Sequence, residues 1–224
     1  MPRKAGEKAA RAAIVEACRW LVEAGLVQGT SGNVSVRFGE RMLITPSGVP
    51  YERMEPEDVV AVELAGDGSS FRARGGNVPS SEWRFHFDIL RSRPEVGAVV
   101  HTHSPYATAF AICRKELVAA HYMIAASGGA TIRVADYATF GTQELSDAAL
   151  VALEGRWACL LANHGVIATG PTLERALWLA QEVEVLARQT AIALQVGTPV
   201  LLPDDEIARV VEKFKVYGPR GTDK

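Results

Sequence analysis

The stretch AVVHTHSPYATA, residues 98–109, contains a strand, a pair of histidines and the start of a helix in direct succession. Residues 98–100 form an apolar run that is typical of a buried strand. His101 and His103 follow with one threonine between them, and side chains two positions apart on a strand point to the same face. A helix is predicted over residues 105–114. The segment therefore predicts two imidazoles that project together from the end of a buried strand.

Strands and helices are mixed on both sides of this stretch without strict alternation. Alternating or apolar patterns predict further strands over residues 33–38, 41–45, 58–64, 130–136, 158–165 and 166–170. Helical spacing predicts helices over residues 6–24, 80–93, 146–153, 172–196 and 204–215, and the polar, glycine-rich segment 65–77 is predicted to be a loop. The mixture predicts an α/β fold, a single layered domain over residues 1–224 with a central mixed, largely antiparallel sheet flanked by helices.

Composition and charge exclude several classes of protein. The chain has 224 residues, 48% of them hydrophobic, which is enough for one substantial core. The formal net charge is -2 and no block of like charge occurs, which argues against a nucleic-acid partner. Neither a signal peptide nor an apolar run of the roughly 18 residues that span a bilayer is recognisable. Because Cys18, Cys113 and Cys159 are odd in number and lie far apart, we expect reduced thiols in a soluble, cytoplasmic protein with no membrane association.

The histidines indicate a metal site. A third imidazole, His164, follows the apolar strand CLLAN, and three imidazoles at strand ends can bind a divalent ion while leaving one position open. The alternative is a set of buried histidines with ordinary hydrogen-bond partners. This alternative is weaker for His101 and His103, because two imidazoles on one face would each need partners in an apolar environment. For His86 and His121 a core position is at least as good an interpretation as a functional role.

Three short stretches have the character of anion-binding loops. They are GTSGN at 29–33, TPSG at 45–48 and PSSE at 79–82. Glycine lets backbone N–H groups turn towards an anion, and a helix N-terminus favours negative charge. Each stretch alone is also compatible with an ordinary turn or cap, but together they suggest a phosphate that is held by neutral donors. Glu82 is then either a surface acid near a helix N-terminus or a carboxylate beside both metal and phosphate, able to transfer protons or bind the metal.

The chain as a whole resembles the class II aldolase/adducin-head family. The resemblance rests on GTSGN, ITPSG, PSSEWRFH, VVHTHS, HYMIAASGG, YATFGT, ANHGVIA, ALWLAQEVEVLA and EKFKVYG, which occur in the same order from about residue 8 to Tyr217. Within the family, the chain looks most like the bacterial L-fuculose-1-phosphate aldolases. The resemblance implies a metal-dependent aldolase that reversibly cleaves a ketose 1-phosphate to dihydroxyacetone phosphate and a small aldehyde such as lactaldehyde.

The resemblance also implies roles for individual residues. His101, His103 and His164 would bind Zn²⁺, and Glu82 would be a metal ligand at rest and the proton-transfer base in turnover. The residues that would hold the phosphate are Thr30, Gly32, Asn33, Ser47, Gly48, Ser80 and Ser81. Tyr122 would reach the site from a neighbouring subunit of a homotetramer, and Tyr217 would close over it from a mobile C-terminal tail that begins at about residue 215.

Several alternatives share these residues. An aldolase for 5-deoxyribulose or 5-methylthioribulose 1-phosphate would use every residue named for the fuculose type. An L-ribulose-5-phosphate 4-epimerase is less consistent, because such epimerases carry aspartate where this chain has Glu82; a methylthioribulose-phosphate dehydratase ranks lower. A metal-free, adducin-like interaction module predicts loss of the three histidines, which are present. A Schiff-base route is disfavoured because the lysines lie in polar or terminal segments, and imidazole also suits first-row ions other than zinc.

Overall fold

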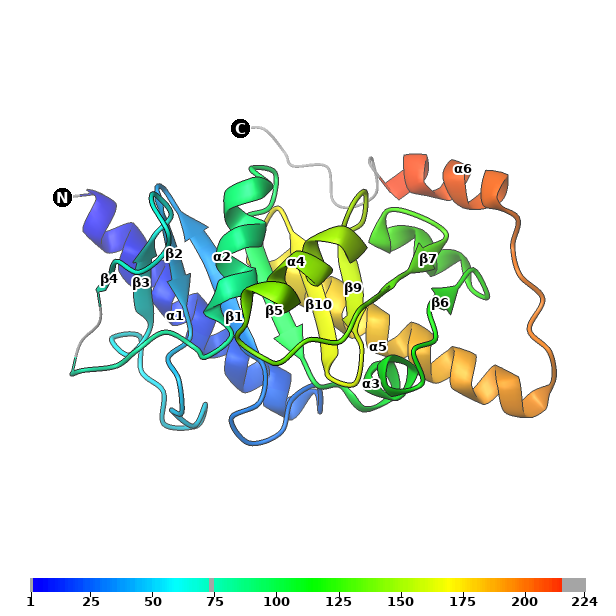
Figure 1. The fold of residues 1–224 in the computed structure, drawn as a ribbon, viewed down its shortest axis with the longest axis horizontal. Coiled ribbons are helices and arrows are strands. Elements are labelled where there is room, and N and C mark those ends of the chain that lie inside the picture. The colour runs from blue at the N-terminus through cyan, green and yellow to red at the C-terminus, as the bar shows by residue number, and fades with distance from the viewer. Residues whose placement is uncertain (1, 73–74, 215–224) are drawn as a thin grey trace.

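The computed structural model describes residues 2–72 and 75–214 (Figure 1). Tyr217 and the predicted C-terminal tail from about residue 215 therefore lie outside the described residues. The predicted α/β architecture is confirmed: a mixed sheet is flanked by helices on both faces (Figure 1).

The sheet contains eight strands in the described part of the chain, in the order β4-β3-β2-β1-β5-β10-β9-β8. Their bounds are β1 Asn33–Phe38, β2 Arg41–Ile44, β3 Val60–Glu63, β4 Phe71–Arg72, β5 Ala98–Thr102, β8 Val134–Ala135, β9 Ala158–Leu161 and β10 Gly165–Gly170. Among these described strands, β8 and β9 pair in parallel and every other neighbouring pair is antiparallel. The sheet is thus largely antiparallel, as the sequence predicted.

Two apolar clusters lie on opposite faces of the sheet. The first packs against α1 (Pro2–Glu23), α3 (Pro105–Ile112) and α5 (Leu173–Val196), and the second against α2 (Trp83–Ser92) and α4 (Gln143–Ala152) (Figure 1). Neighbouring residues of one strand therefore belong to different clusters: Ala98 and Val100 of β5 face the α1 side, whereas Val99 faces the α2 side. Because both faces are covered, the strands β5, β9 and β10 at the centre of the sheet are mostly apolar.

Short elements differ from the sequence prediction. The strand expected over 130–136 divides at Arg133: β7 (Thr131–Ile132) pairs with β6 (Leu117–Val118) in a small second sheet, while β8 joins the main sheet. β4 lies inside the predicted loop 65–77, and the 3-10 helix η1 (Tyr122–Ser127) was not expected. These elements are only two to six residues long, so their formation depends on tertiary partners more than on local pattern.

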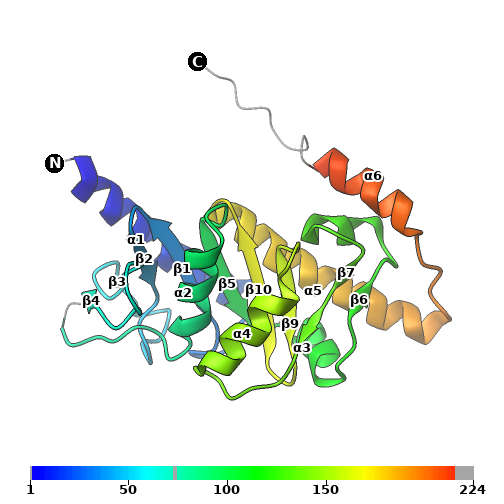
Figure 2. The ribbon, with the colours of Figure 1, turned by 45° about the horizontal axis from the view of Figure 1, so that its top comes forward.

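The last helix, α6 (Asp204–Phe214), lies beside η1 at one end of the molecule and follows an extended segment after α5 (Figure 2). Cys18, Cys113 and Cys159 are free thiols. Among the described residues, no helix combines the length and the apolar character that a membrane span requires.

Candidate metal centre

The candidate site lies at one edge of the sheet, where β5 ends and its two neighbours begin. In the register of the sheet, His101 of β5 lies opposite Asn33 of β1 on one side and Ile167 of β10 on the other. Because both pairings are antiparallel, the end of β5 meets the first residues of β1 and β10. The turn between β9 and β10 adds His164 to the same edge.

Glu82 and three histidines meet at this edge. One ligand atom from each of Glu82, His101, His103 and His164 lies within 4.8 Å of the others. The Nε2 atoms of His101 and His103 are 3.0 Å apart, as expected for side chains that share one face. Glu82 Oε1 lies 3.0 Å from His164 Nε2, and Oε2 lies 3.3 Å from His101 Nε2. The structure thus brings together the four residues that the sequence selected.

The donor set fits a metal ion. His101 is fully buried, and its Nδ1 lies 2.8 Å from the carbonyl oxygen of Val166. That hydrogen bond requires a proton on Nδ1, so Nε2 of a neutral ring presents a lone pair to the cluster. This lone pair faces a carboxylate oxygen and a second imidazole nitrogen at close range, an arrangement that a shared proton or a bound cation would stabilise. Three imidazoles and one carboxylate are ligands that zinc and similar ions accept.

The charges in the cluster are strongly coupled. Burial by itself raises the pKa of the Glu82 carboxyl, but the adjacent imidazoles of His101 and His164 outweigh burial and hold that pKa below its usual range. Burial, together with the charge of the neighbouring histidines, lowers the pKa of His103 to about 4. The carboxylate is therefore ionised and His103 is neutral at pH 7, which are the protonation states that metal binding needs.

Two glycines allow the close approach of the strands. A Cβ on Gly165 would lie 2.9 Å from Cδ2 of His103 and would overlap the carbonyl oxygen of Thr102. A Cβ on Gly32 would lie 2.8 Å from the carbonyl oxygen of His101, and Gly32 has a φ of +81°, a conformation that disfavours other residues. Gly32 of GTSGN and Gly165 of ANHG are thus required by the packing around the histidines.

A cavity of about 470 Å³ opens next to the cluster. Glu82, His103 and His164 line it, whereas His101 lies buried beneath. All seven residues predicted to hold a phosphate also line this cavity: Thr30, Gly32, Asn33, Ser47, Gly48, Ser80 and Ser81. The three predicted anion-binding loops therefore meet in one place, next to the candidate metal ligands.

Further residues of the cavity were not selected from the sequence. Tyr137 and Phe140 are exposed aromatic residues on its rim, and Asn163 precedes His164 in the turn between β9 and β10. Tyr51 also lines it and donates a hydrogen bond to the carbonyl oxygen of Gly32, which holds the GTSGN loop. Both aromatic residues belong to the motif YATFGT, which contributed to the family resemblance, but the sequence pattern by itself assigns them no role.

The two remaining histidines have different surroundings. His86 of α2 is fully buried and is hydrogen-bonded to Ser35 and Asn33 of β1, and burial lowers its pKa to about 3. His121 caps η1 by accepting a hydrogen bond from the backbone N–H of Met123, and its ring lies against Tyr122. His86 thus links to the site through Asn33, which the sequence did not reveal.

Tyr122 does not reach the cavity of its own subunit. It lies in η1, its side chain is 51% exposed, and it lines a separate hollow with residues of α6. A role for Tyr122 in the site therefore requires a neighbouring subunit, as the resemblance implied.

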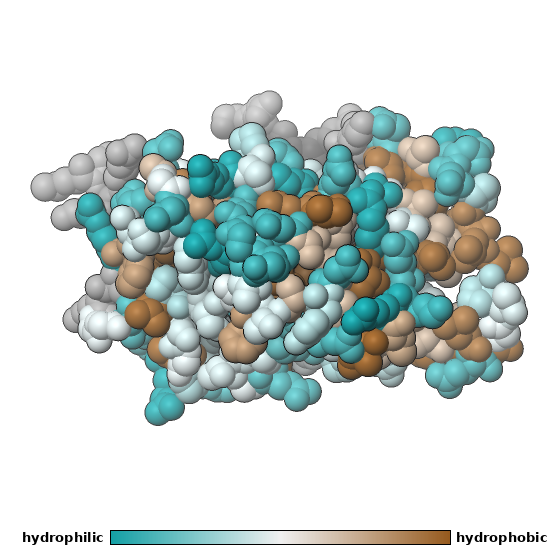
Figure 3. Space-filling view, viewed as in Figure 1, coloured by the Kyte–Doolittle hydropathy of each residue, from teal (hydrophilic) through white to brown (hydrophobic). Residues whose placement is uncertain are grey.

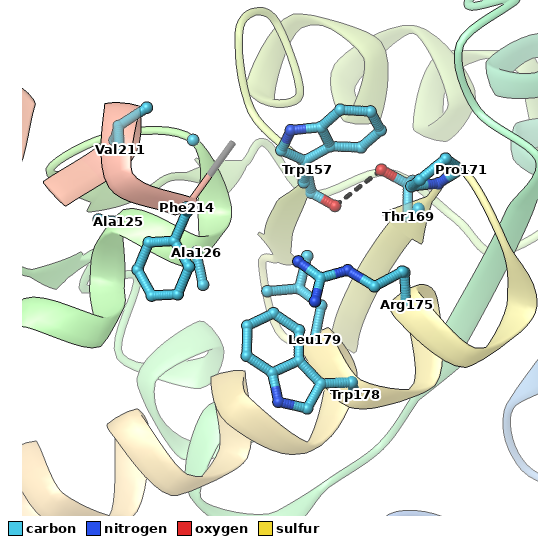
Figure 4. Close-up of a pocket in the computed structure, with 12 residues that line it drawn as sticks. Ala125, Ala126, Trp157, Thr169, Pro171, Arg175, Trp178, Leu179, Val211 and Phe214 are labelled. Atoms are coloured by element: carbon cyan, nitrogen blue, oxygen red, sulfur yellow. Dashed lines mark hydrogen bonds between the residues drawn. The ribbon is translucent and has the colours of Figure 1, made fainter. Parts of the chain in front are cut away.

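A second cavity lies at the opposite end of β10. Its volume is about 290 Å³, and Trp157, Trp178 and Phe214 are among the side chains that line it (Figure 4). The guanidinium of Arg175 lies 4.4 Å from the Trp178 ring, and Thr169 donates a hydrogen bond to the carbonyl oxygen of Trp157 (Figure 4). None of the clustered Glu and His residues borders this cavity, so it is separate from the candidate metal centre.

Known proteins resemble this chain over most of its length. The family described as Class II Aldolase and Adducin N-terminal domain matches residues 12–191. A 5-methylthioribulose-1-phosphate/5-deoxyribulose-1-phosphate aldolase of Rhodospirillum rubrum is 53% identical over 210 residues, which are 94% of this chain and 93% of that protein. An L-fuculose phosphate aldolase of Escherichia coli (strain K12) is 50% identical over 208 residues, which are 92% of this chain and 94% of that protein. Among solved structures, an L-fuculose 1-phosphate aldolase matches with a TM-score of 0.87 and 41% identity, covering 92% of this chain and 96% of that chain.

Proposed function

This chain belongs to the class II aldolase and adducin N-terminal domain family and is an aldolase, hence a lyase, and on that premise we propose that it cleaves a ketose 1-phosphate reversibly to dihydroxyacetone phosphate and a small aldehyde. The observation that carries the proposal is the meeting of Glu82, His103 and His164 with three neutral anion-binding loops in one cavity. A metal-free interaction module would have no use for this combination of ligands and phosphate donors.

The metal in this proposal is zinc, held by His101, His103 and His164, with Glu82 as a further ligand in the resting state. When bound, the ion would supply Lewis-acid stabilisation of the negative charge that develops on the substrate oxygens as the carbon–carbon bond breaks. The three imidazoles are neutral ligands, so they leave the charge of the ion undiminished. Glu82 is the single carboxylate of the cluster, and its displacement by substrate would free it for proton transfer.

Different residues of the cavity would act on different parts of the substrate. Thr30, Ser47 and Ser81 line the cavity together with Gly32 and Gly48. The hydroxyl groups of the first three and the backbone N–H groups of the glycines would bind the phosphate. Ser80 and Ser81 immediately precede Glu82, which is the N-cap residue of α2, so a phosphate there would also benefit from the helix dipole. The phosphate would then hold the adjacent carbons of the ketose within reach of the Glu82 carboxylate, which would move a proton to or from the dihydroxyacetone half.

The aldehyde half is proposed to be lactaldehyde, from L-fuculose 1-phosphate. The second candidate is a 5-deoxyribulose or 5-methylthioribulose 1-phosphate, because the R. rubrum relative named for these substrates is 53% identical. The exposed rings of Tyr137 and Phe140 on the rim of the cavity suit either a methyl or a methylthio end group.

We also propose a homotetramer in which Tyr122 enters the site of a neighbouring subunit and protonates the aldehyde oxygen. In support, Tyr122 is half-exposed and lines a hollow other than the cavity of its own subunit. Apolar side chains also gather at the end of the molecule where α5 leads to α6 (Figure 3). The exposed large apolar residues of this stretch are Ile192, Leu194, Val196, Val200 and Leu201, and such surfaces favour association. Closure over the site by Tyr217 stays a prediction.

A cleavage assay tests the proposed function. The purified protein is incubated with fuculose, rhamnulose, deoxyribulose and methylthioribulose 1-phosphates, and release of dihydroxyacetone phosphate is followed with a coupled reductase. Cleavage of the fuculose ester supports the first candidate, and preference for the deoxyribulose or methylthioribulose ester supports the second. Release from none of the four esters, or epimerisation of ribulose 5-phosphate instead, would contradict the proposal.

A further inference from the structure

A chain of buried hydrogen bonds connects Ser35 and His86 to the candidate base. Ser35 Oγ lies 2.8 Å from Nδ1 of His86, and Nε2 of His86 contacts Oδ1 of Asn33. The Nδ2 of Asn33 donates a hydrogen bond of 2.9 Å to Oε2 of Glu82. All four residues are buried, and Asn33 is only 3% exposed. This series of hydrogen bonds therefore lies between β1 and α2, with Asn33 and Glu82 at the end that borders the cavity.

The chemistry of the four groups determines which atom donates and which accepts in each of these hydrogen bonds. An ionised carboxylate only accepts hydrogen bonds, so Asn33 must turn its NH₂ group towards Glu82. Its Oδ1 then faces His86, whose Nε2 must carry the ring proton. The Nδ1 of His86 is left as an acceptor for the hydroxyl of Ser35. Each group thus determines the orientation of the next, from Ser35 to Glu82.

The secondary structure places these groups without strain. Asn33 and Ser35 are two positions apart on β1, so they share the face that packs against α2. Glu82 and His86 are four positions apart, with Glu82 the N-cap residue of α2, so they lie one turn apart on the same side of the helix. A histidine at this apolar interface is costly unless both of its ring nitrogens have partners, and here both do.

The two oxygens of Glu82 are held differently as a result. Oε2 is anchored by Asn33. Oε1 has no hydrogen-bond partner in the described part of the chain, although His164 Nε2 lies 3.0 Å away. The anchored oxygen sets the orientation of the carboxylate, and the other oxygen stays available to the reaction.

We propose that His86 is a positioning residue, which orients the Asn33 amide and thereby holds Glu82 with Oε1 as the oxygen that transfers the proton. The proposal rests on the function proposed above, because it assigns a task to the base of that reaction. In this arrangement the side chain of Asn33 serves the carboxylate in addition to lining the phosphate cavity. His86 acts only through Asn33 and contacts no substrate.

Kinetics of paired variants test the proposal. His86→Leu removes the donor that orients Asn33 and so weakens the hydrogen bond from Asn33 to the Glu82 carboxylate. We expect kcat to fall about tenfold to a hundredfold, the range of a hydrogen bond to a charged group, with KM within about twofold. His86→Gln, which keeps an N–H donor facing Asn33, should recover most of this loss. Thr190→Val is the control, because it removes a buried hydroxyl that donates a hydrogen bond to the carbonyl oxygen of Leu186 within α5; it should leave kcat unchanged.

A double-mutant cycle separates positioning from a general packing role. If His86 acts through Asn33, His86→Leu should have no further effect on kcat in an Asn33→Ala background. Additive losses in the double variant would overturn the proposal, as would a His86→Leu enzyme with the parent kcat.

A spectroscopic measurement is independent of activity. Nitrogen NMR of the purified protein should show His86 protonated on Nε2 and unprotonated on Nδ1, with the signals assigned by their absence from His86→Gln. The opposite tautomer would overturn the proposal whether or not the protein cleaves a sugar phosphate. If the parent protein cleaves no ketose 1-phosphate but has the expected tautomer, the proposed function fails while the hydrogen-bond chain stands.

Discussion

Replacement of Glu82 by glutamine tests the role of the carboxylate with little change of shape. In the parent, Oε2 accepts a hydrogen bond from Asn33 and Oε1 lies 3.0 Å from His164 Nε2. A glutamine must keep its carbonyl oxygen on Asn33, because two NH₂ groups cannot face each other there. Its own NH₂ group then points towards His164, so the amide fits the site but can no longer accept a proton.

The size of the effect follows from the chemistry that is lost. General acid–base catalysis contributes about 10²–10⁴ in rate, which corresponds to about 3–5 kcal/mol in the activation barrier. We therefore expect Glu82→Gln to lose a factor of this size in kcat. The three imidazoles are unchanged, so the metal content should stay near that of the parent.

The assay is release of dihydroxyacetone phosphate, with metal content measured on the same samples. Glu95→Gln is the matched control, because it makes the same substitution in a half-exposed carboxylate that pairs with Arg93 on the surface; its rate should equal that of the parent. Release at the parent rate by Glu82→Gln would refute the assignment of Glu82 as the base.

Three further predictions concern the same site. His164→Ala should lose bound metal and activity together, and metal analysis that found full occupancy with no activity would contradict its role as a ligand. Gly165→Ala places a methyl group against two strands at the cluster and should lower the free energy of unfolding by about 1–3 kcal/mol in urea titrations. Gly197→Ala, where the added group meets nothing within 4 Å, should change it little, and equal effects would refute the packing argument. Tyr122→Phe should lower kcat while the metal is retained. Mixing its subunits with those of Glu82→Gln should restore part of the activity, because some sites then combine an intact Glu82 with an intact Tyr122 from the neighbouring subunit. No recovery after verified subunit exchange would show that Tyr122 does not act in a neighbour's site.

Much of the site could be predicted because its residues are tied to local patterns. His101 and His103 share a strand face, and the spacing alone indicated that their imidazoles would meet. The loops that carry Thr30, Ser47 and Ser81 were recognisable from glycine and hydroxyl residues, and they do line one cavity. Patterns of this kind depend on neighbours in the sequence, so they are readable without the fold.

Other features depend on distant partners and could not be predicted. The contacts of His86 with Ser35 and Asn33 join residues that are 51 and 53 positions apart, so no local pattern marks them. The division of the predicted strand at Arg133 follows from pairing with two different sheets. Sequence patterns therefore located the chemical groups, whereas their orientation required the packing of β1 against α2.

The central claim is that this chain breaks a carbon–carbon bond with a metal held by the histidine cluster. The most direct measurement is release of dihydroxyacetone phosphate from the best ketose 1-phosphate by one preparation in three states: as purified, after removal of metal by a chelator, and after return of zinc. The account predicts that activity disappears with the metal and returns with zinc, up to one ion per subunit. Undiminished release by the metal-free protein would contradict it.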